Sequence, residues 1–134
     1  TRILSIEMHY YRVEKAERGD IVGLAVKGVR YDELRRGMVV TRLPPRTVWE
    51  FEADVYVFSH PTRIRPGYEP VVHLETIPET VIFEEMNVEY LKAADRGRVR
   101  MRFKYHPQFV FPGQKFIFRE GRSKGMGEIV EIFE

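Results

Sequence analysis

The chain of 134 residues contains no cysteine. This absence excludes a disulfide framework, a thiolate zinc site and a cysteine nucleophile, and it fits a reducing, cytoplasmic setting. Side-chain amides are also scarce: Asn87, Gln108 and Gln114 are the full set. Few amides among many Glu and Arg charges are typical of a thermophile's surface chemistry. No stretch approaches the roughly 20 apolar residues of a membrane span, and no signal peptide opens the sequence, so we expect no membrane partner.

Basic residues only slightly outnumber acidic ones. The net charge is +2, but the basic residues comprise 16 Arg and 6 Lys, and the sequence pI is about 8.9. Arginine forks match phosphates and carboxylates geometrically, so the bias indicates phosphate contact. The alternative is ion pairing with the 16 glutamates. With 43% hydrophobic residues, the chain can bury a core.

No residue set for catalysis stands out. The four histidines (His9, His60, His73 and His106) are scattered, and no Ser-His-Asp set with a nucleophile elbow is present. His73 and Glu75 share a strand face and could begin a metal site, but no third ligand is evident. The phosphate-loop spacing Gly-x4-Gly-Lys-Ser/Thr is absent.

Period-two alternation dominates the chain and predicts β-strands. We expect a half-buried strand at 4–10, a buried strand at 21–29, a short helical turn at 32–37 and a short strand at 38–40. Beyond these, we expect strands at 51–57, 68–77, 80–86, 96–105, 108–111, 115–119 and 128–133, with a hairpin turn at Pro112-Gly113. Such spacing without long helices predicts an all-β fold of antiparallel β-barrels.

Pro44-Pro45 interrupts the alternation and predicts a domain boundary, because two prolines stiffen the chain and remove two ladder donors. We therefore expect a first barrel piece at 1–43, a linker at 44–47 and a complete small barrel at 48–134. About three strands would leave the first piece with open edges, which soluble proteins avoid. Since the chain also starts with Thr1, we expect a fragment whose first barrel is cut short.

The clearest chemical pattern is the alternation at 96–105, where every even position from Arg96 to Lys104 is basic. On a strand this places five cations on one face, at ~6.7 Å intervals along a ~27 Å stripe. Opposing charge must lie nearby, and two interpretations remain open. In the first, cross-strand glutamates such as Glu79, Glu84 and Glu85 form ion pairs with the cations of the stripe. A nucleic-acid backbone would supply phosphates at similar spacing.

Two further basic groups flank expected turns. Arg63 and Arg65 lie in the turn at 60–67, and Arg119, Arg122 and Lys124 lie in a glycine-rich segment at 119–127. Glycines there allow close backbone approach, so the three cations are candidates for clamping a phosphate. The alternative is an ordinary hairpin eased by glycine.

Several segments together resemble a known family. The first part of the chain is similar to the second half of domain two in elongation factor Tu and elongation factor 1-alpha. The segments that carry this similarity are Ser5-Ile6-Glu7-Met8-His9, 18–24, 26–29 and 36–40. Residues 51–55, His60-Pro61 and 67–71 resemble the opening of domain three, and 118–127 resembles its last hairpin. This last segment is especially similar to the GTP-binding-protein-1 branch of translational GTPases.

The resemblance implies two β-barrels that follow an N-terminal GTPase domain, which would bind GTP and magnesium; no cofactor is expected for this chain itself. It also implies docking of tRNA acceptor and T stems on domain three. The family's Arg-Glu-Gly approach to tRNA matches Arg119, Glu120 and Gly121. Family contacts elsewhere fall on His106, His60 and Val71 in this sequence, and the three alterations favour an archaeal or eukaryotic-type relative.

The sequence thus predicts the C-terminal barrel region of an elongation-factor-like GTP-binding protein that docks tRNA or ribosomal RNA without catalysis of its own. The predicted RNA-binding residues are Arg63, Arg65, Arg98, Arg100, Arg102, Lys104, His106, Arg119, Glu120, Gly121, Arg122 and Lys124. The alternative is a protein-interaction module that contacts the parent's GTPase domain or a nucleotide-exchange partner, with Tyr10, Tyr11 and Tyr56 as interface anchors.

Overall fold

The computed structural model describes residues 1–42, 46–75 and 77–134, and it divides into two compact units, Thr1–Met38 and Val39–Glu134. The predicted prolines Pro44-Pro45 lie outside the described residues, so the linker at 44–47 and the bounds 1–43 and 48–134 stay predictions. Among the described residues, no helix is long and apolar enough to cross a membrane.

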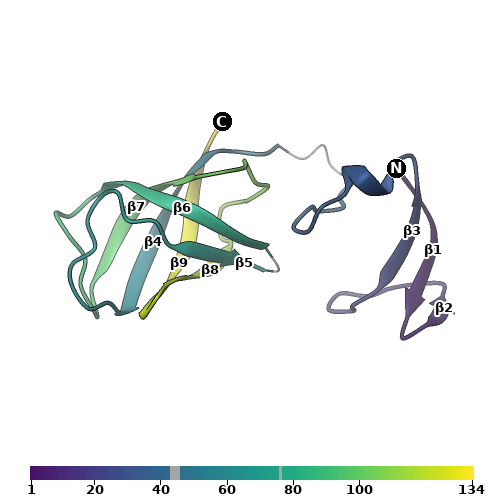
Figure 1. The fold of residues 1–134 in the computed structure, drawn as a ribbon, viewed down its shortest axis with the longest axis horizontal. Coiled ribbons are helices and arrows are strands. Elements are labelled where there is room, and N and C mark those ends of the chain that lie inside the picture. Colours follow the sequence, from purple (N-terminus) through teal and green to yellow (C-terminus); the bar gives the residue numbers. More distant parts are fainter. Residues whose placement is uncertain (43–45, 76) are drawn as a thin grey trace. The chain divides into compact units, whose positions relative to one another are not determined.

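The first unit is a three-stranded antiparallel sheet in the order β2-β1-β3 (Figure 1). Its strands are β1 (Arg2–Met8), β2 (Tyr11–Val13) and β3 (Gly23–Lys27), followed by a 3-10 helix at Tyr31–Glu33. The Glu33 carboxylate accepts a hydrogen bond from the Arg30 backbone N–H at 2.7 Å, which caps this short helix.

Two expectations for the first unit are wrong. The segment 21–29 is not a buried strand: Ile21 is 91% exposed, and none of the unit's residues from 1 to 38 is buried. Within the described residues of this unit, the sheet is a single layer. Residues 38–40 do not form a strand, because this short apolar run pairs with no described strand.

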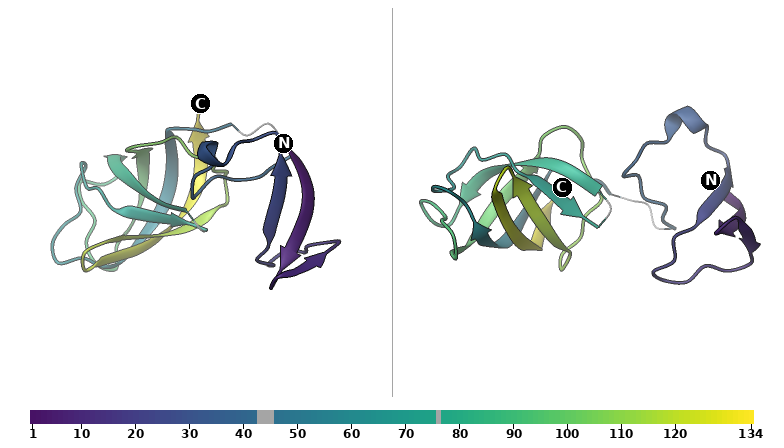
Figure 2. Two further views of the ribbon diagram at one scale, coloured as in Figure 1. Left: turned by 45° about the vertical axis from the view of Figure 1, so that its right-hand side comes forward. Right: turned by 60° about the horizontal axis from the view of Figure 1, so that its bottom comes forward.

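The second unit is a closed six-stranded barrel in the order β4-β7-β6-β5-β8-β9, with all neighbours antiparallel. Its strands are β4 (Glu50–Ser59), β5 (Val71–Leu74), β6 (Ile77–Met86), β7 (Arg96–Phe103), β8 (Lys115–Glu120) and β9 (Ser123–Phe133). Figures 1 and 2 show the strands curving round a common interior. The predicted antiparallel barrel is thereby confirmed for this unit.

Alternation explains why these strands close. On β4, Phe51, Ala53, Val55 and Val57 point inward and are at most 3% exposed, while the residues between them point outward. Phe83 packs against Phe118 at 5.7 Å between ring centroids, and Phe51 packs against Phe103 at 5.2 Å. Burying such rings is worth roughly 1.5–3 kcal/mol each. The barrel is therefore the stable body that positions the outward-facing side chains.

The segment at 108–111 is the one predicted barrel strand that is missing from the described residues. It forms a single bridge, between Gln108 and Val48. Pro112-Gly113 does form the predicted turn, with the Gln114 N–H donating to the Phe111 carbonyl at 3.2 Å, but this turn leads from the bridge into β8 rather than joining two strands.

Candidate nucleic-acid interface

The basic stripe on β7 lies on the outside of the barrel, directly beside an acidic stripe on β4. The register places Glu50 opposite Arg102, Glu52 opposite Arg100 and Asp54 opposite Arg98. Arg98 donates two hydrogen bonds to Asp54, at 2.8 and 3.1 Å, and Arg100 donates one to Glu50 at 2.5 Å. Arg102 lies 3.8 Å from Glu50, and Lys104 donates to Glu69 at 2.6 Å. Four of the five stripe cations are therefore ion-paired within the barrel.

These pairs shift the ionisation of their members. Hydrogen bonds from Arg98 hold the pKa of Asp54 below its ordinary value of 3.8, and the same contact raises the pKa of Arg98. A hydrogen bond to Glu50 raises the pKa of Arg100, and one to Glu69 raises that of Lys104. Each group is held in its charged form by its partner.

The Asp54–Arg98 pair gives a pH-dependent prediction. Because the folded pKa of Asp54 is lowered, its carboxylate stabilises the fold above about pH 3.8, and this stabilisation is lost as pH falls through the folded pKa. We expect Asp54→Asn to flatten the acid limb of the stability–pH curve while costing less than about 1 kcal/mol at pH 7, since both side chains are about half exposed. Urea unfolding from pH 2.5 to 7 measures this. An acid limb as steep as that of the parent chain would contradict it.

The acids that pair the stripe differ from those expected. Among Glu79, Glu84 and Glu85, only Glu85 lies opposite a stripe residue, Arg100. A register shift between Phe83 and Glu85 takes Glu84 out of the ladder. Glu79 lies beyond the end of β7, where it accepts a hydrogen bond from Gln108 at 2.6 Å and lies 3.8 Å from His106. The main partners lie on β4, which is the other neighbour of β7.

A second group of cations gathers at one end of the barrel. The segments 60–67, 87–95 and 119–124 follow or precede the strand ends that lie away from the C-terminus (Figure 1). We define the cationic end as Arg63, Arg65, Lys92, Arg119, Arg122 and Lys124. Within the described ranges, the only ion pair of this set joins Arg65 to Glu89 at 3.9 Å. Five of its six cations thus form no ion pair among the described residues, unlike those of the stripe, and the acids of the same segments are Glu89, Asp95 and Glu120.

Aromatic stacking orders two of these cations. The Arg63 guanidinium lies 4.2 Å from the centroid of the Tyr90 ring, and Arg65 lies 5.8 Å from the same centroid. Between them, Ile64 is 1% exposed and pairs with Leu91 through two backbone hydrogen bonds. The buried Ile64 anchors the loop, so both arginines project from a fixed backbone rather than from a free one.

The hairpin between β8 and β9 is held by the end of β4. Arg119 lies opposite Lys124 in the register, so two like charges face each other across this hairpin. Ser59 donates from its hydroxyl to the Arg122 carbonyl at 3.1 Å. His60 Nδ1 lies 2.5 Å from the hydroxyl of Ser123, which is 3% exposed. These contacts fix the backbone from which Arg122 and Lys124 project.

Tyr68 completes the support beneath the hairpin. Its ring packs edge-on against His60 at 5.4 Å and against Phe83 at 5.2 Å. Burial raises the pKa of its hydroxyl, and the neighbouring Ser123 side chain opposes part of that rise. Within the described part of the chain, the buried hydroxyl has no partner in hydrogen-bonding geometry.

Eleven of the twelve predicted RNA-binding residues therefore fall into two sets, and the cations of only one set are mostly without ion pairs among the described residues. Arg63, Arg65, Arg119, Glu120, Gly121, Arg122 and Lys124 lie at the cationic end. Arg98, Arg100, Arg102 and Lys104 lie on the paired stripe, and His106 lies beyond the stripe beside Glu79. Sequence reasoning missed Lys92 at the cationic end and Glu69, the partner of Lys104, as well as three acids of β4: Glu50, Glu52 and Asp54. Their own alternation at 50–54 mirrors that of the arginines and is the signal that could have found them.

The described residues build no cluster of metal ligands. No group of three or more His, Asp or Glu that could hold a metal ion exists among residues 1–42, 46–75 and 77–134, and His73 and Glu75 gain no third ligand there. The sequence also has no phosphate loop.

The fold and the electropositive end define a small antiparallel β-barrel module with a second, smaller β-sheet unit before it. Residues 44–132 match the family described as the elongation factor Tu C-terminal domain, and the chain belongs to this family. It is 39% identical to elongation factor 1-alpha of Aeropyrum pernix and 34% identical to GTP-binding protein 1 of Xenopus laevis. It is also 29% identical to GTP-binding protein 2 of Mus musculus.

These matches cover 97–98% of this chain, but the chain spans only 35% of the length of that elongation factor and 20–22% of the two GTP-binding proteins. Residues 44–132 therefore correspond to the C-terminal domain of this family, as the resemblance implied. The remaining parts of such proteins account for most of their length.

Proposed function

We propose that the barrel docks tRNA or ribosomal RNA through the phosphate backbone at its cationic end, as part of an elongation-factor-like GTP-binding protein, and has no catalysis of its own. The observation that carries this proposal is the contrast between the two basic surfaces. The stripe is ion-paired by Glu50, Glu52, Asp54 and Glu69, whereas the cationic end has one long ion pair among the described residues.

Uncompensated cations on fixed backbone suit a polyanion. Phosphate binding to Lys and Arg releases condensed counterions, so affinity depends steeply on salt and little on sequence. The hairpin is held by Ser59 and His60, and the Arg63–Arg65 loop by the buried Ile64. Less conformational entropy is lost when charges on such supports bind. The surface therefore supplies positioning for a bound RNA.

A salt titration tests the proposal. We expect Arg122→Ala with Lys124→Ala to lower the affinity for tRNA about tenfold at 0.1 M salt, and to reduce the slope of log K against log salt by about 1.8, or 0.9 per lost phosphate contact. Fluorescence anisotropy with labelled tRNA measures both quantities.

The matched control removes two cations from elsewhere, with Arg2→Gln and Lys27→Gln, which face each other on β1 and β3. This control should leave the slope almost unchanged. An equal loss of slope in both variants would mean that net charge alone drives binding, and the proposal would then be wrong.

The second candidate function is contact with a GTPase domain or an exchange partner through the first unit. Tyr10 is 100% exposed and Tyr11 is 77% exposed, and both His9 and Tyr10 adopt positive φ values, 53° and 68°. Large exposed rings on a strained turn favour a binding role. Substitutions there that change protein docking while leaving RNA affinity intact would support this candidate.

A further inference from the structure

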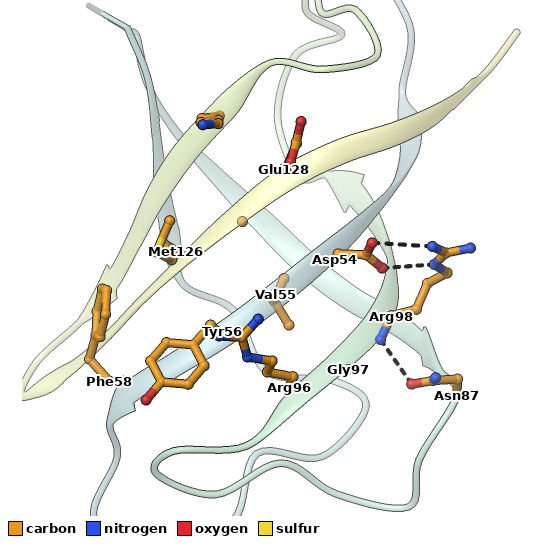
Figure 3. Close-up of a pocket in the computed structure, with 12 residues that line it drawn as sticks. Asp54, Val55, Tyr56, Phe58, Asn87, Arg96, Gly97, Arg98, Met126 and Glu128 are labelled. Carbon is orange, nitrogen blue, oxygen red and sulfur yellow. Dashed lines mark hydrogen bonds and ion pairs between the residues drawn. The ribbon is translucent and has the colours of Figure 1, made fainter.

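A groove opens on the outer face of the barrel, away from the interior, where β4, β7, β8 and β9 lie side by side (Figure 3). Its volume is about 930 Å³. Its apolar part is formed by Tyr56 and Phe58 from β4 and by Met126 from β9; Phe58 is 47% exposed and Met126 is 40% exposed. Outward-facing positions of this barrel are otherwise mostly charged, so the groove is an unusual feature of its surface.

A cation lies beside the two rings. The Arg96 guanidinium lies 5.1 Å from the centroid of the Tyr56 ring, and Tyr56 meets the Phe58 ring edge-on at 5.3 Å. Lys124 lies outside the lining of the groove, opposite Ser59 in the β4–β9 register and beyond a register shift between Val57 and Ser59. The groove itself therefore offers one cation next to two rings.

The acids of the groove form no ion pair with Arg96. Asp54 is engaged by the two hydrogen bonds from Arg98, and Glu128, which lies opposite Lys115 in the β8–β9 register, forms no ion pair within the described ranges. Arg96 has no carboxylate within ion-pair distance among the residues that the structure describes. An occupant that covers the groove must therefore bring negative charge to Arg96 and a flat apolar surface to Phe58.

We propose that this groove binds unpaired nucleotides of RNA, with a base stacked on Phe58 and a phosphate next to Arg96. Single-stranded nucleic acids are bound by this combination of aromatic platforms and a cationic track. A duplex keeps its bases stacked inside and offers only phosphates, so it would leave Phe58 exposed. A wholly apolar protein segment would bury the Arg96 charge without a partner, which is costly.

The inference rests on the proposed RNA docking, and it adds a preference for single strands. The test uses the full chain with two RNA probes: a single strand of about 12 nucleotides carrying 2-aminopurine, and a blunt-ended duplex with a similar number of phosphates. We expect Phe58→Leu to weaken binding of the single strand about tenfold and to abolish much of the 2-aminopurine quenching. Duplex affinity and the salt slope should not change, because no charge is removed.

Two further variants keep the result interpretable. Phe133→Leu is the matched control, because Phe133 also lies on the outer face with a guanidinium, that of Arg100, 4.1 Å from its centroid, but outside the groove. It should leave both affinities unchanged. Phe58→Trp retains a stacking ring and should restore single-strand binding.

The outcomes separate the two proposals. Equal losses for both probes, or an unchanged single-strand affinity in Phe58→Leu, overturn the groove inference. In that case the salt slope of Arg122→Ala with Lys124→Ala still tests RNA docking at the cationic end independently. If that double variant reduces the slope of log K against log salt and Phe58→Leu has no effect, the detected RNA contacts are all to phosphates.

Discussion

Replacing Gly125 with alanine should lower the free energy of unfolding by about 3 kcal/mol or more. Gly125 lies on the inward face of β9, directly opposite Phe118 on β8. A Cβ at this position would overlap the Phe118 ring and lie 2.7 Å from the carbonyl oxygen of Tyr56. The ring is fully buried and packs edge-on against Phe83, while the carbonyl is backbone, so neither can move without disturbing the barrel.

The control for Gly125→Ala is Gly113→Ala. Gly113 has a φ of 91° and no atom within 4 Å of the added Cβ, so it tests backbone strain alone, about 1–2 kcal/mol. Urea unfolding followed by tyrosine and tryptophan fluorescence measures both. Combining Gly125→Ala with Phe118→Leu should cost less than the sum of the two single changes, because a smaller side chain makes room for the methyl group. Additive losses would show that ring overlap is not the cause.

The glycine–ring pairs show what alternation predicts and what it does not. The sequence predicts inward positions from apolar residues, and this works for β4, where every second residue is apolar and buried. On β9 the inward positions 125 and 127 are glycines, which carry no hydrophobic signal. Each makes room for a ring on β8, Phe118 and Phe116 respectively. The need for glycine follows from cross-strand pairing, which alternation within one strand does not reveal.

Strand order limits the prediction of the site in the same way. The alternation at 96–104 predicts correctly that four arginines share the outward face of β7, and Lys104 lies just beyond the end of this strand. Their partners depend on which strand lies beside β7, and β4 is separated from β7 by more than 30 residues of sequence. Two of the three suggested glutamates, Glu79 and Glu84, lie on the sequence-adjacent strand but outside the pairing. The local alternation thus predicts which face of β7 carries the cations. The closure of the barrel, which places β4 beside β7, determines whether those cations are ion-paired.

The first unit shows the opposite limit. Apolar residues at 21–29 predict burial, yet none of residues 1–38 is buried. Hydrophobic pattern reports which side of a strand is suited to packing, not whether a second layer is present. The barrel satisfies its pattern because the sheet closes on itself, so each inward face meets another.

Removing the acids that form ion pairs with the stripe should produce a large increase in RNA affinity. The triple variant Glu50→Gln, Glu52→Gln and Asp54→Asn removes the β4 carboxylates that pair with Arg98, Arg100 and Arg102. Three guanidiniums would then be available to phosphates, on a strand whose backbone is fixed by the barrel. We expect affinity for tRNA at 0.1 M salt to rise about 100-fold, and the slope of log K against log salt to steepen by about 2.7, or 0.9 per new contact.

Net charge alone gives a smaller effect, and a matched variant isolates it. Glu7→Gln, Glu14→Gln and Glu84→Gln also remove three negative charges, from residues that form no ion pair in the described part of the chain. This variant should raise affinity only severalfold, since its added positive potential is dispersed and screened beyond about 10 Å. If the triple stripe variant bound no better than this control, the arginines would still be unavailable after their carboxylates were removed. The stripe would then be inaccessible to RNA for steric reasons, and ion pairing would not be the reason that its arginines do not bind RNA.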